Sequence, residues 1–325
     1  MLIPSITDIQ AAHSRIRPFI HWTPVLSSSL INRITGAQIF FKCENFQKVG
    51  AFKFRGATNA VLQLSDAEKK RGVVTHSSGN HAAALAHAAN KAGVRAYIVM
   101  PETAPSVKKE AVAGYGAEIT FCKPTLQSRE DTANEIIGRT GAVLIHAYDN
   151  QNVICGQGTA ALELLGEKPG LDIVIAPVGG GGLLSGTTIA AKGISGDIKV
   201  IGAEPANADD ACRSLKAGKI IPSINPETIA DGLLTSLSER TYFIIKNYSD
   251  GIFTASEELI IAAMKLVWER MKIVIEPSSA TALAIVMANN DYFSGKKVGI
   301  ILSGGNVDLA KLPFQEGFLN HAITG

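Results

Sequence analysis

The segment VVTHSSGNHAAALAHAANKAGVRAYIVMP, residues 73–101, decides the fold class of this 325-residue chain. Its two ends, VVTHS and AYIVMP, are short apolar runs typical of buried strands. The Ala-rich stretch between them favours a helix that ends at Gly93. Two buried strands joined by a helix form the crossover unit of a parallel sheet. The segment therefore predicts an α/β fold with helices on both faces of the sheet.

The same alternation continues on both sides of this segment. A capping box formed by Ser65 and Glu68 predicts the start of a helix just before it. The other predicted strands are 117–122, 142–147, 171–178, 199–205 and 296–303, and the other predicted helices are 106–116, 128–141, 183–193 and 257–272. Ligands of such sheets usually bind beyond the carboxyl ends of the strands, so the turns that follow strands are the places to search for a site.

Composition and charge narrow the class of protein. The chain is 46% hydrophobic and 18% charged, which is enough apolar material for a sizeable core. The formal net charge of +2 and the absence of long Lys/Arg runs argue against nucleic acid or an anionic membrane as a partner. No stretch reaches the roughly 18 apolar residues of a membrane span, and the N-terminus lacks a signal-peptide pattern. Four scattered cysteines without a CxxC pair fit a reducing compartment, so we expect a cytoplasmic protein.

The strongest functional signal is APVGGGGLLSGTTIA, residues 176–190, in which Gly179, Gly180, Gly181 and Gly182 follow an apolar strand and precede a helix. Glycine lets the backbone approach an anion, and a helix start presents free N–H groups. A tight turn is the alternative, but it requires fewer glycines. The spacing departs from GxGxxG, because Ser185 stands where the third glycine belongs, and it lacks the GK[ST] ending of a P-loop. We infer a phosphate or carboxylate site of another type.

Lys53 lies between two phenylalanines in KCENFQKVGAFKFRGATNAV, residues 42–61. A lysine that attacks an aldehyde must first lose its proton, and apolar surroundings lower its pKa by desolvation. A surface lysine on an amphipathic edge strand is the alternative, and this segment alone does not decide between them.

Three more turns follow predicted strands. In THSSGNH, the side chains of Ser77, Ser78 and Asn80 could hold a carboxylate or simply cap a helix. In LSGGNVD, the hydroxyl of Ser303 could face a ligand or cap a turn. In GAEPANADD, the carboxylates of Glu204 and Asp210 near a strand end, with a backbone carbonyl, suit a hard cation, although an ordinary helix start fits equally well.

Together, and in the order in which they follow one another along the chain, these segments resemble the serine/threonine dehydratase and serine racemase family. These are the fold type II enzymes that use pyridoxal 5'-phosphate. The resemblance covers residues 5–310. It implies that Lys53 attaches the cofactor covalently and that Phe52 lies near its ring. The other cofactor contacts that it implies are Asn80 at the ring hydroxyl, Gly179, Gly180, Gly181 and Gly182 at the phosphate, Gly232 and Glu276 beside the cofactor, and Ser303 at the pyridine nitrogen.

The resemblance also implies an architecture similar to tryptophan synthase β: two open, twisted parallel-sheet domains with flanking helices. The large domain would be discontinuous, with residues 1–68 and 150–325, and the small domain would comprise residues 69–149. The active site would lie between the two domains. A homodimer is the usual state of the family.

The implied substrate is a small hydroxy amino acid. Lys53 would act as base at Cα, and Ser78 matches the residue that serine racemases place on the opposite face. We therefore expect a serine racemase that also eliminates water from serine or threonine to give a 2-oxo acid and ammonia. The substrate contacts implied by the resemblance are Ser77, Ser78, Asn80, His81 and Arg129. Arg129 could accept a second carboxylate, which would suit 3-hydroxyaspartate, or it could be a surface charge.

The resemblance further implies a divalent cation, Mg²⁺ or Ca²⁺ with Mn²⁺ as a third candidate. Glu204 and Asp210 would bind it through their side chains, and Ala208 through its carbonyl.

Two alternatives stay open. One is a threonine or serine dehydratase, or a 3-hydroxyaspartate ammonia-lyase, without significant racemisation. The other is a cofactor-free binding protein on the same fold. Tyr148, Val49, Ala51 and Ala82 depart from the residues usual in relatives, so nucleotide activation is not implied. The sequence does not rank serine, threonine and 3-hydroxyaspartate.

Overall fold

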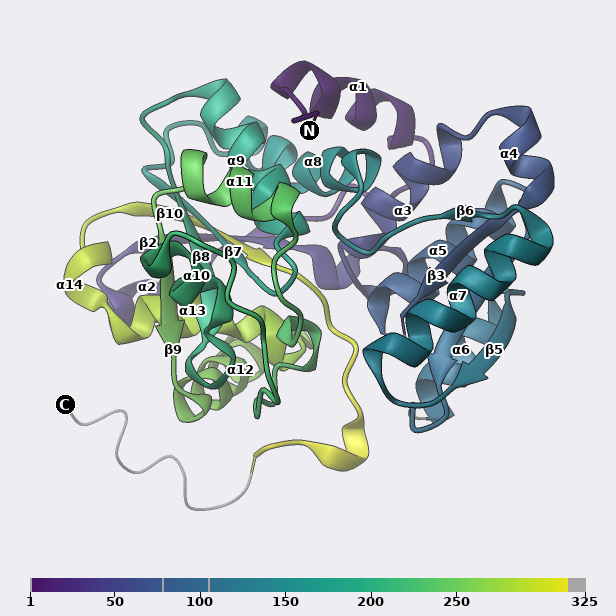
Figure 1. The fold of residues 1–325 in the computed structure, drawn as a ribbon. Helices are drawn as coiled ribbons and strands as arrows, with labels where there is room; N and C mark the ends of the chain where they lie inside the picture. Colours follow the sequence, from purple (N-terminus) through teal and green to yellow (C-terminus); the bar gives the residue numbers. More distant parts are fainter. Residues whose placement is uncertain (1, 78, 105, 315–325) are drawn as a thin grey trace.

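The computed structural model describes residues 2–77, 79–104 and 106–314. The strands within these ranges form two sheets that lie side by side (Figure 1). The six-stranded sheet has the order β1-β2-β10-β7-β8-β9, and the four-stranded sheet has the order β5-β4-β3-β6. The strands are β1 (Val25–Leu26), β2 (Gln38–Cys43), β3 (Val73–His76), β4 (Ala96–Pro101), β5 (Glu118–Cys122), β6 (Val143–Leu144), β7 (Ile173–Pro177), β8 (Lys199–Pro205), β9 (Ile252–Ala255) and β10 (Lys297–Leu302).

Helices cover both sheets. The α-helices are α1 (Ile6–Ile16), α2 (Ser29–Thr35), α3 (Lys53–Leu62), α4 (Asp66–Arg71), α5 (Asn80–Lys91), α6 (Ser106–Gly114), α7 (Leu126–Thr140), α8 (Gln151–Glu167), α9 (Gly182–Ile194), α10 (Asp210–Ala217), α11 (Glu239–Tyr248), α12 (Glu257–Met271), α13 (Pro277–Ala288) and α14 (Asn290–Phe293). The short 3₁₀-helices are η1 (Glu44–Phe46), η2 (Lys48–Gly50), η3 (Ala206–Ala208), η4 (Asp231–Leu233) and η5 (Leu309–Lys311). Among the described helices, none is long and apolar enough to cross a membrane.

The predicted fold class is confirmed. Both sheets are parallel apart from the β1–β2 pair, and the segment 73–101 forms β3, α5 and β4 as expected. All four strands of the smaller sheet come from the middle of the chain, and the other strands form the larger sheet. The domain boundaries after residues 68 and 149 stay a prediction, which this division of the strands supports.

One expected strand is shorter than predicted, and one alternative for Lys53 is excluded. The strand expected at 142–147 is reduced to β6, because beyond it the Ile145 carbonyl faces the His81 ring and the His146 side chain accepts backbone N–H groups. Lys53 does not lie on an edge strand, because it is the first residue of α3. The structure thereby excludes the edge-strand alternative for this lysine.

The core brings α3 into direct contact with α8. A Cβ added to Gly156 of α8 would lie 2.5 Å from the Cα of Gly56, so only glycine allows this approach. In the six-stranded sheet, β10, β7 and β8 are neighbours, and their carboxyl ends carry LSGGNVD, the glycine turn and GAEPANADD. Because parallel strands end at the same edge, the three motifs meet there.

Candidate active site

Lys53 is fixed by its neighbours in the chain. The Phe52 N–H donates to the Ser303 carbonyl at 2.9 Å, and Ala51 and Gly304 form an antiparallel bridge. These bonds attach the start of α3 to the end of β10. The Nζ atom of Lys53 donates to the Ala147 carbonyl at 3.0 Å. Burial lowers the pKa of Lys53 to about 8, although the nearby carboxylate of Glu276 opposes this shift. The amine is thus prepared to act as a nucleophile or base near neutral pH.

The glycine turn has the shape of an anion cradle. Gly181 adopts a left-handed conformation with φ of 85°, and Gly182 begins α9, whose first N–H groups have no partner within the helix. A Cβ on Gly180 would overlap the Tyr148 ring, and one on Gly179 would lie 3.2 Å from the Gly232 carbonyl. Neighbouring protein atoms therefore leave no room for a side chain in this turn, so only glycine fits and the turn presents its backbone.

The remaining predicted cofactor residues gather beside this turn. Ser303 is buried, and its Oγ lies 3.1 Å from the Oγ of Ser279. The Gly232 N–H donates to the Ser278 hydroxyl at 3.0 Å. Glu276 is buried at the start of α13, and burial raises the pKa of its carboxyl to about 7. The place predicted for the cofactor ring is thus bordered by hydroxyl groups, a backbone N–H group and a carboxyl group whose pKa is raised.

Asn80 joins the two halves of the molecule. It begins α5 beside the smaller sheet, yet its Nδ2 donates to both oxygens of Glu276 at 3.0 and 3.1 Å. Asn306, which follows β10, donates from its Nδ2 to the Oδ1 of Asn80 at 2.9 Å. The start of α5 is therefore held against the LSGGN segment.

The predicted substrate residues have different surroundings. Ser77 is half-buried, and its Oγ accepts from the Gly79 N–H at 3.4 Å, while Ser78 lies outside the described residues. The His81 ring is buried with Nε2 2.9 Å from the Ile145 carbonyl, and burial lowers its pKa to about 3. Since this ring is engaged with the smaller sheet, any contact of His81 with substrate would use its backbone N–H. Arg129 lies half-buried on α7.

Two further imidazoles lie near Lys53 that sequence reasoning did not assign to the site. The rings of His76 and His146 are 5.8 Å apart, and the Tyr148 ring lies 4.6 Å from His146. Burial lowers the pKa of His146 to about 4, helped by His76 and Lys53, and burial and Arg129 lower the pKa of His76. The available signal was that His146 lies at the end of a predicted strand of the same alternating segment as SSGNH.

The predicted cation residues also lie together. The Glu204 carboxylate accepts from the backbone N–H groups of Ala211 and Cys212, at 2.8 and 2.9 Å, and burial raises its pKa to about 8. Asp210 is buried, burial raises its pKa to about 6, and among the described residues neither of its carboxylate oxygens has a hydrogen-bond partner. Among the described residues, no three His, Cys, Asp or Glu side chains form a group that could hold a metal ion. A third ligand would thus be a carbonyl, and buried Ala208 is suitably placed in the chain.

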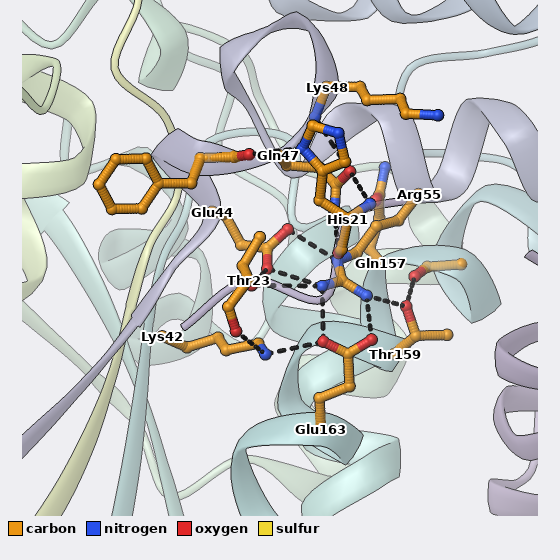
Figure 2. Close-up of polar contacts among 12 residues, drawn as sticks. His21, Thr23, Lys42, Glu44, Gln47, Lys48, Arg55, Gln157, Thr159 and Glu163 are labelled. Atoms are coloured by element: carbon orange, nitrogen blue, oxygen red, sulfur yellow. Dashed lines mark hydrogen bonds and ion pairs between the residues drawn. The ribbon is translucent and has the colours of Figure 1, made fainter. Parts of the chain in front are cut away.

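Lys42, Glu44, Arg55 and Glu163 form a buried ion network (Figure 2), and Arg55 lies in α3, the helix that Lys53 begins. Arg55 Nε donates to Glu44 at 2.7 Å and Nη1 donates to Glu163 at 2.7 Å, while Lys42 Nζ lies 2.7 Å from the other oxygen of Glu163. All four side chains are fully buried. The network ties α3 to β2, η1 and α8, and nothing in the sequence analysis indicated it.

Comparison with known proteins places this fold and site in one class. A family model described as "Pyridoxal-phosphate dependent enzyme" matches residues 16–304, so the chain belongs to that family. The chain is 52% identical to a beta-hydroxyaspartate dehydratase of Paracoccus denitrificans over 97% of its own length and 100% of that protein. It is 53% identical to a serine racemase of Dictyostelium discoideum over 96% and 98% of the two chains.

Solved structures agree with this assignment. The serine racemase structure from Dictyostelium discoideum superposes with a TM-score of 0.91 at 54% identity, covering 94% of this chain and 99% of that one. The structure of a maize serine racemase superposes with a TM-score of 0.93 at 44% identity, covering 95% of each chain. A threonine deaminase structure superposes with a TM-score of 0.90 at 43% identity, covering 95% of this chain and 100% of that one. The family recognised from the sequence is confirmed, and with it the use of pyridoxal 5'-phosphate, which the basic lysine and the glycine cradle fit.

The pKa of Lys53 predicts how the protein takes up its cofactor. Only the neutral amine attacks an aldehyde, so the rate of covalent attachment of added pyridoxal 5'-phosphate to the apoprotein should rise with pH around a midpoint near 8. Stopped-flow recording of the visible absorption band measures this rate. Lys53→Ala should give no such band. A midpoint near the ordinary lysine pKa of about 10.4 would contradict the proposed environment.

Proposed function

We propose that the protein is a serine racemase that also eliminates water from serine and threonine, giving a 2-oxo acid and ammonia. The observation that carries the proposal is the amine of Lys53, which has a lowered pKa and lies where the carboxyl ends of the sheet strands meet. The serine racemase and threonine deaminase relatives support this choice of substrates. Membership of a family of pyridoxal-phosphate dependent enzymes does not support the alternative hypothesis of a cofactor-free binding protein.

Each residue has a chemical role in this proposal. Bound pyridoxal 5'-phosphate supplies an electron sink for negative charge that develops at Cα. Lys53 attaches it and, as a neutral amine, takes the Cα proton and can return it. The Gly179–Gly182 turn binds the phosphate, and Ser303 offers the ring nitrogen a neutral hydroxyl rather than a charge that would keep it protonated. Phe52, Gly232 and Glu276 would border the ring, and Asn80 would contact its hydroxyl.

The opposite face of Cα decides between the two reactions. We propose Ser78 as the second acid/base, on the strength of the SSGNH resemblance, since racemisation must deliver a proton to that face. Ser77, the N–H groups at the start of α5, and Asn80 bind the substrate carboxylate. The position of α5 beside Glu276 supports this part of the proposal.

A second candidate is 3-hydroxyaspartate ammonia-lyase. The beta-hydroxyaspartate dehydratase relative covers the whole chain at a similar identity. The guanidinium of Arg129 would bind the second carboxylate. The charge of Arg129 contributes to the lowered pKa of His76, whose ring lies 5.8 Å from that of His146, and this supports a position of Arg129 on the same side of the site.

A divalent cation, a homodimer and a cytoplasmic location complete the proposal. Mg²⁺, Ca²⁺ or Mn²⁺ would bind Glu204, Asp210 and the Ala208 carbonyl, and the unpartnered carboxylate of Asp210 among the described residues supports this. The homodimer rests on the family resemblance alone. The four free, buried cysteines support a reducing compartment such as the cytoplasm.

A substrate panel tests the reaction. Incubated with L-serine, L-threonine and 3-hydroxyaspartate, the holoenzyme should release 2-oxo acid and convert L-serine to D-serine, measured by chiral chromatography. Ser78→Ala should lower D-serine formation about 100-fold, the usual loss for one acid/base, and affect 2-oxo acid formation far less. D-serine at background level would exclude racemisation. Activity on 3-hydroxyaspartate alone, lost in Arg129→Met, would favour the second candidate.

Removal of the cation tests the metal site. Adding Mg²⁺ or Ca²⁺ to EDTA-treated protein should raise its melting temperature by several degrees, because the ion binds only the folded state. Asp210→Asn should abolish this rise. Asp209→Asn is the matched control, since Asp209 instead pairs with Arg213 at 2.6 Å. An equal rise in Asp210→Asn and in the control would place the cation elsewhere.

A further inference from the structure

A chain of side-chain amides crosses from the Lys53 segment to Glu276. The Nδ2 of Asn306 donates to the Val49 carbonyl at 2.8 Å and to the Oδ1 of Asn80 at 2.9 Å. The Nδ2 of Asn80 then donates to the two oxygens of Glu276 at 3.0 and 3.1 Å. The backbone N–H of Asn306 donates to the same carboxyl at 3.1 Å. Three separate segments thus converge on Asn80.

The hydrogen bonds in this chain of amides can run in only one donor-to-acceptor direction. At one end stands the Val49 carbonyl, which can only accept, so Asn306 must present its NH₂ group there. The other end is the carboxylate of Glu276, which already accepts the backbone N–H of Asn306. Turning the Asn80 amide over would set its carbonyl against that carboxylate and its NH₂ against the NH₂ of Asn306. With Glu276 ionised, both contacts would be repulsive, so in that state the orientation of Asn80 follows from its neighbours.

The nitrogen end of Asn80 faces the cofactor residues. The carboxylate that it contacts lies against Gly304, where an added Cβ would be 2.9 Å from Glu276 Oε1, and near Gly232, where the distance would be 4.0 Å. The oxygen end faces Asn306 and the turn at Val49. That turn is held in an uncommon conformation, with φ of 57° at Val49, and its carbonyl is aimed at Asn306.

We propose that Asn306 and Glu276 are positioning residues that hold Asn80 with its NH₂ group on the cofactor side, so that one N–H donates to the ring hydroxyl and binds it in its ionised form. An N–H donor stabilises an ionised oxygen, whereas a carbonyl would require the hydroxyl to keep its proton. The inference rests on the proposed contact between Asn80 and the ring hydroxyl. It gives Glu276 a role through Asn80 and gives Asn306 a role that its sequence position did not reveal.

Asn306→Asp tests the proposal with an almost isosteric change that removes the NH₂ donor. In the holoenzyme without substrate, the long-wavelength absorption of the ionised ring form should fall at least about twofold in favour of the short-wavelength form. The dissociation constant of pyridoxal 5'-phosphate should rise about tenfold, the effect of one hydrogen bond to a charged group. The matched control is Asn45→Asp, because Asn45 donates to the Val274 carbonyl at 3.0 Å outside the amide chain. Equal spectra in the two variants would overturn the proposal.

A second variant separates positioning from simple support of the fold. In Asn306→Asp combined with Glu276→Gln, the donor and acceptor ends are exchanged, so a turned-over Asn80 is satisfied on both sides. Thermal stability should recover toward the wild type while the absorption stays shifted. If spectrum and stability recover together, the two residues only support the fold and the proposal fails.

These outcomes are independent of the proposed reaction. The spectra are recorded without substrate, so a protein that racemises nothing still reports the orientation of Asn80. Conversely, an unchanged spectrum in Asn306→Asp with full racemase activity in the wild type would overturn the inference alone.

Discussion

Arg55 and its two carboxylates form the interaction on which the rest of the site depends. Glu44 of η1 and Glu163 of α8 both pair with Arg55 (Figure 2). Lys42 of β2 also pairs with Glu163, so the buried network contains two cations and two carboxylates. Removing one partner of a buried ion pair costs about 3–5 kcal/mol, so the network strongly opposes separation of these elements. Lys53 lies two residues before Arg55 at the start of the same helix. The network therefore restricts where its amine can be.

The second constraint is the shared edge of parallel strands. Each motif alone has an ordinary structural use, as a turn, a cap or a strand end. The neighbouring order of β10, β7 and β8 sets Ser303, the glycine turn and Glu204 at one edge, and Asn80 reaches this edge from the smaller sheet. A cofactor with a phosphate, a ring nitrogen and a ring hydroxyl needs such a set of separate, fixed partners. The fold thus supplies the geometry, and the residues at the edge supply the chemistry.

Local patterns in the sequence were sufficient for the fold class and for the motifs. The alternation of apolar runs and helical stretches predicted β3, α5, β4, β7, α9 and β8, because short-range periodicity determines such elements. The Ser65 capping box was confirmed for the same reason. The ion network could not be predicted, since Arg55 and Glu163 are 108 residues apart and charged side chains are normally exposed. His146 and Asn306 were missed because their importance depends on what lies across the interface between the sheets.

The account depends most directly on Lys53 being the residue that binds the cofactor. Borohydride reduction of the holoenzyme, followed by digestion and peptide mass spectrometry, measures the site of attachment. The structure predicts one modified peptide, with the cofactor on Lys53, whose amine is buried beside the Ala147 carbonyl and has a pKa of about 8. Attachment to Lys48 or to another lysine, with Lys53 unmodified, would contradict it.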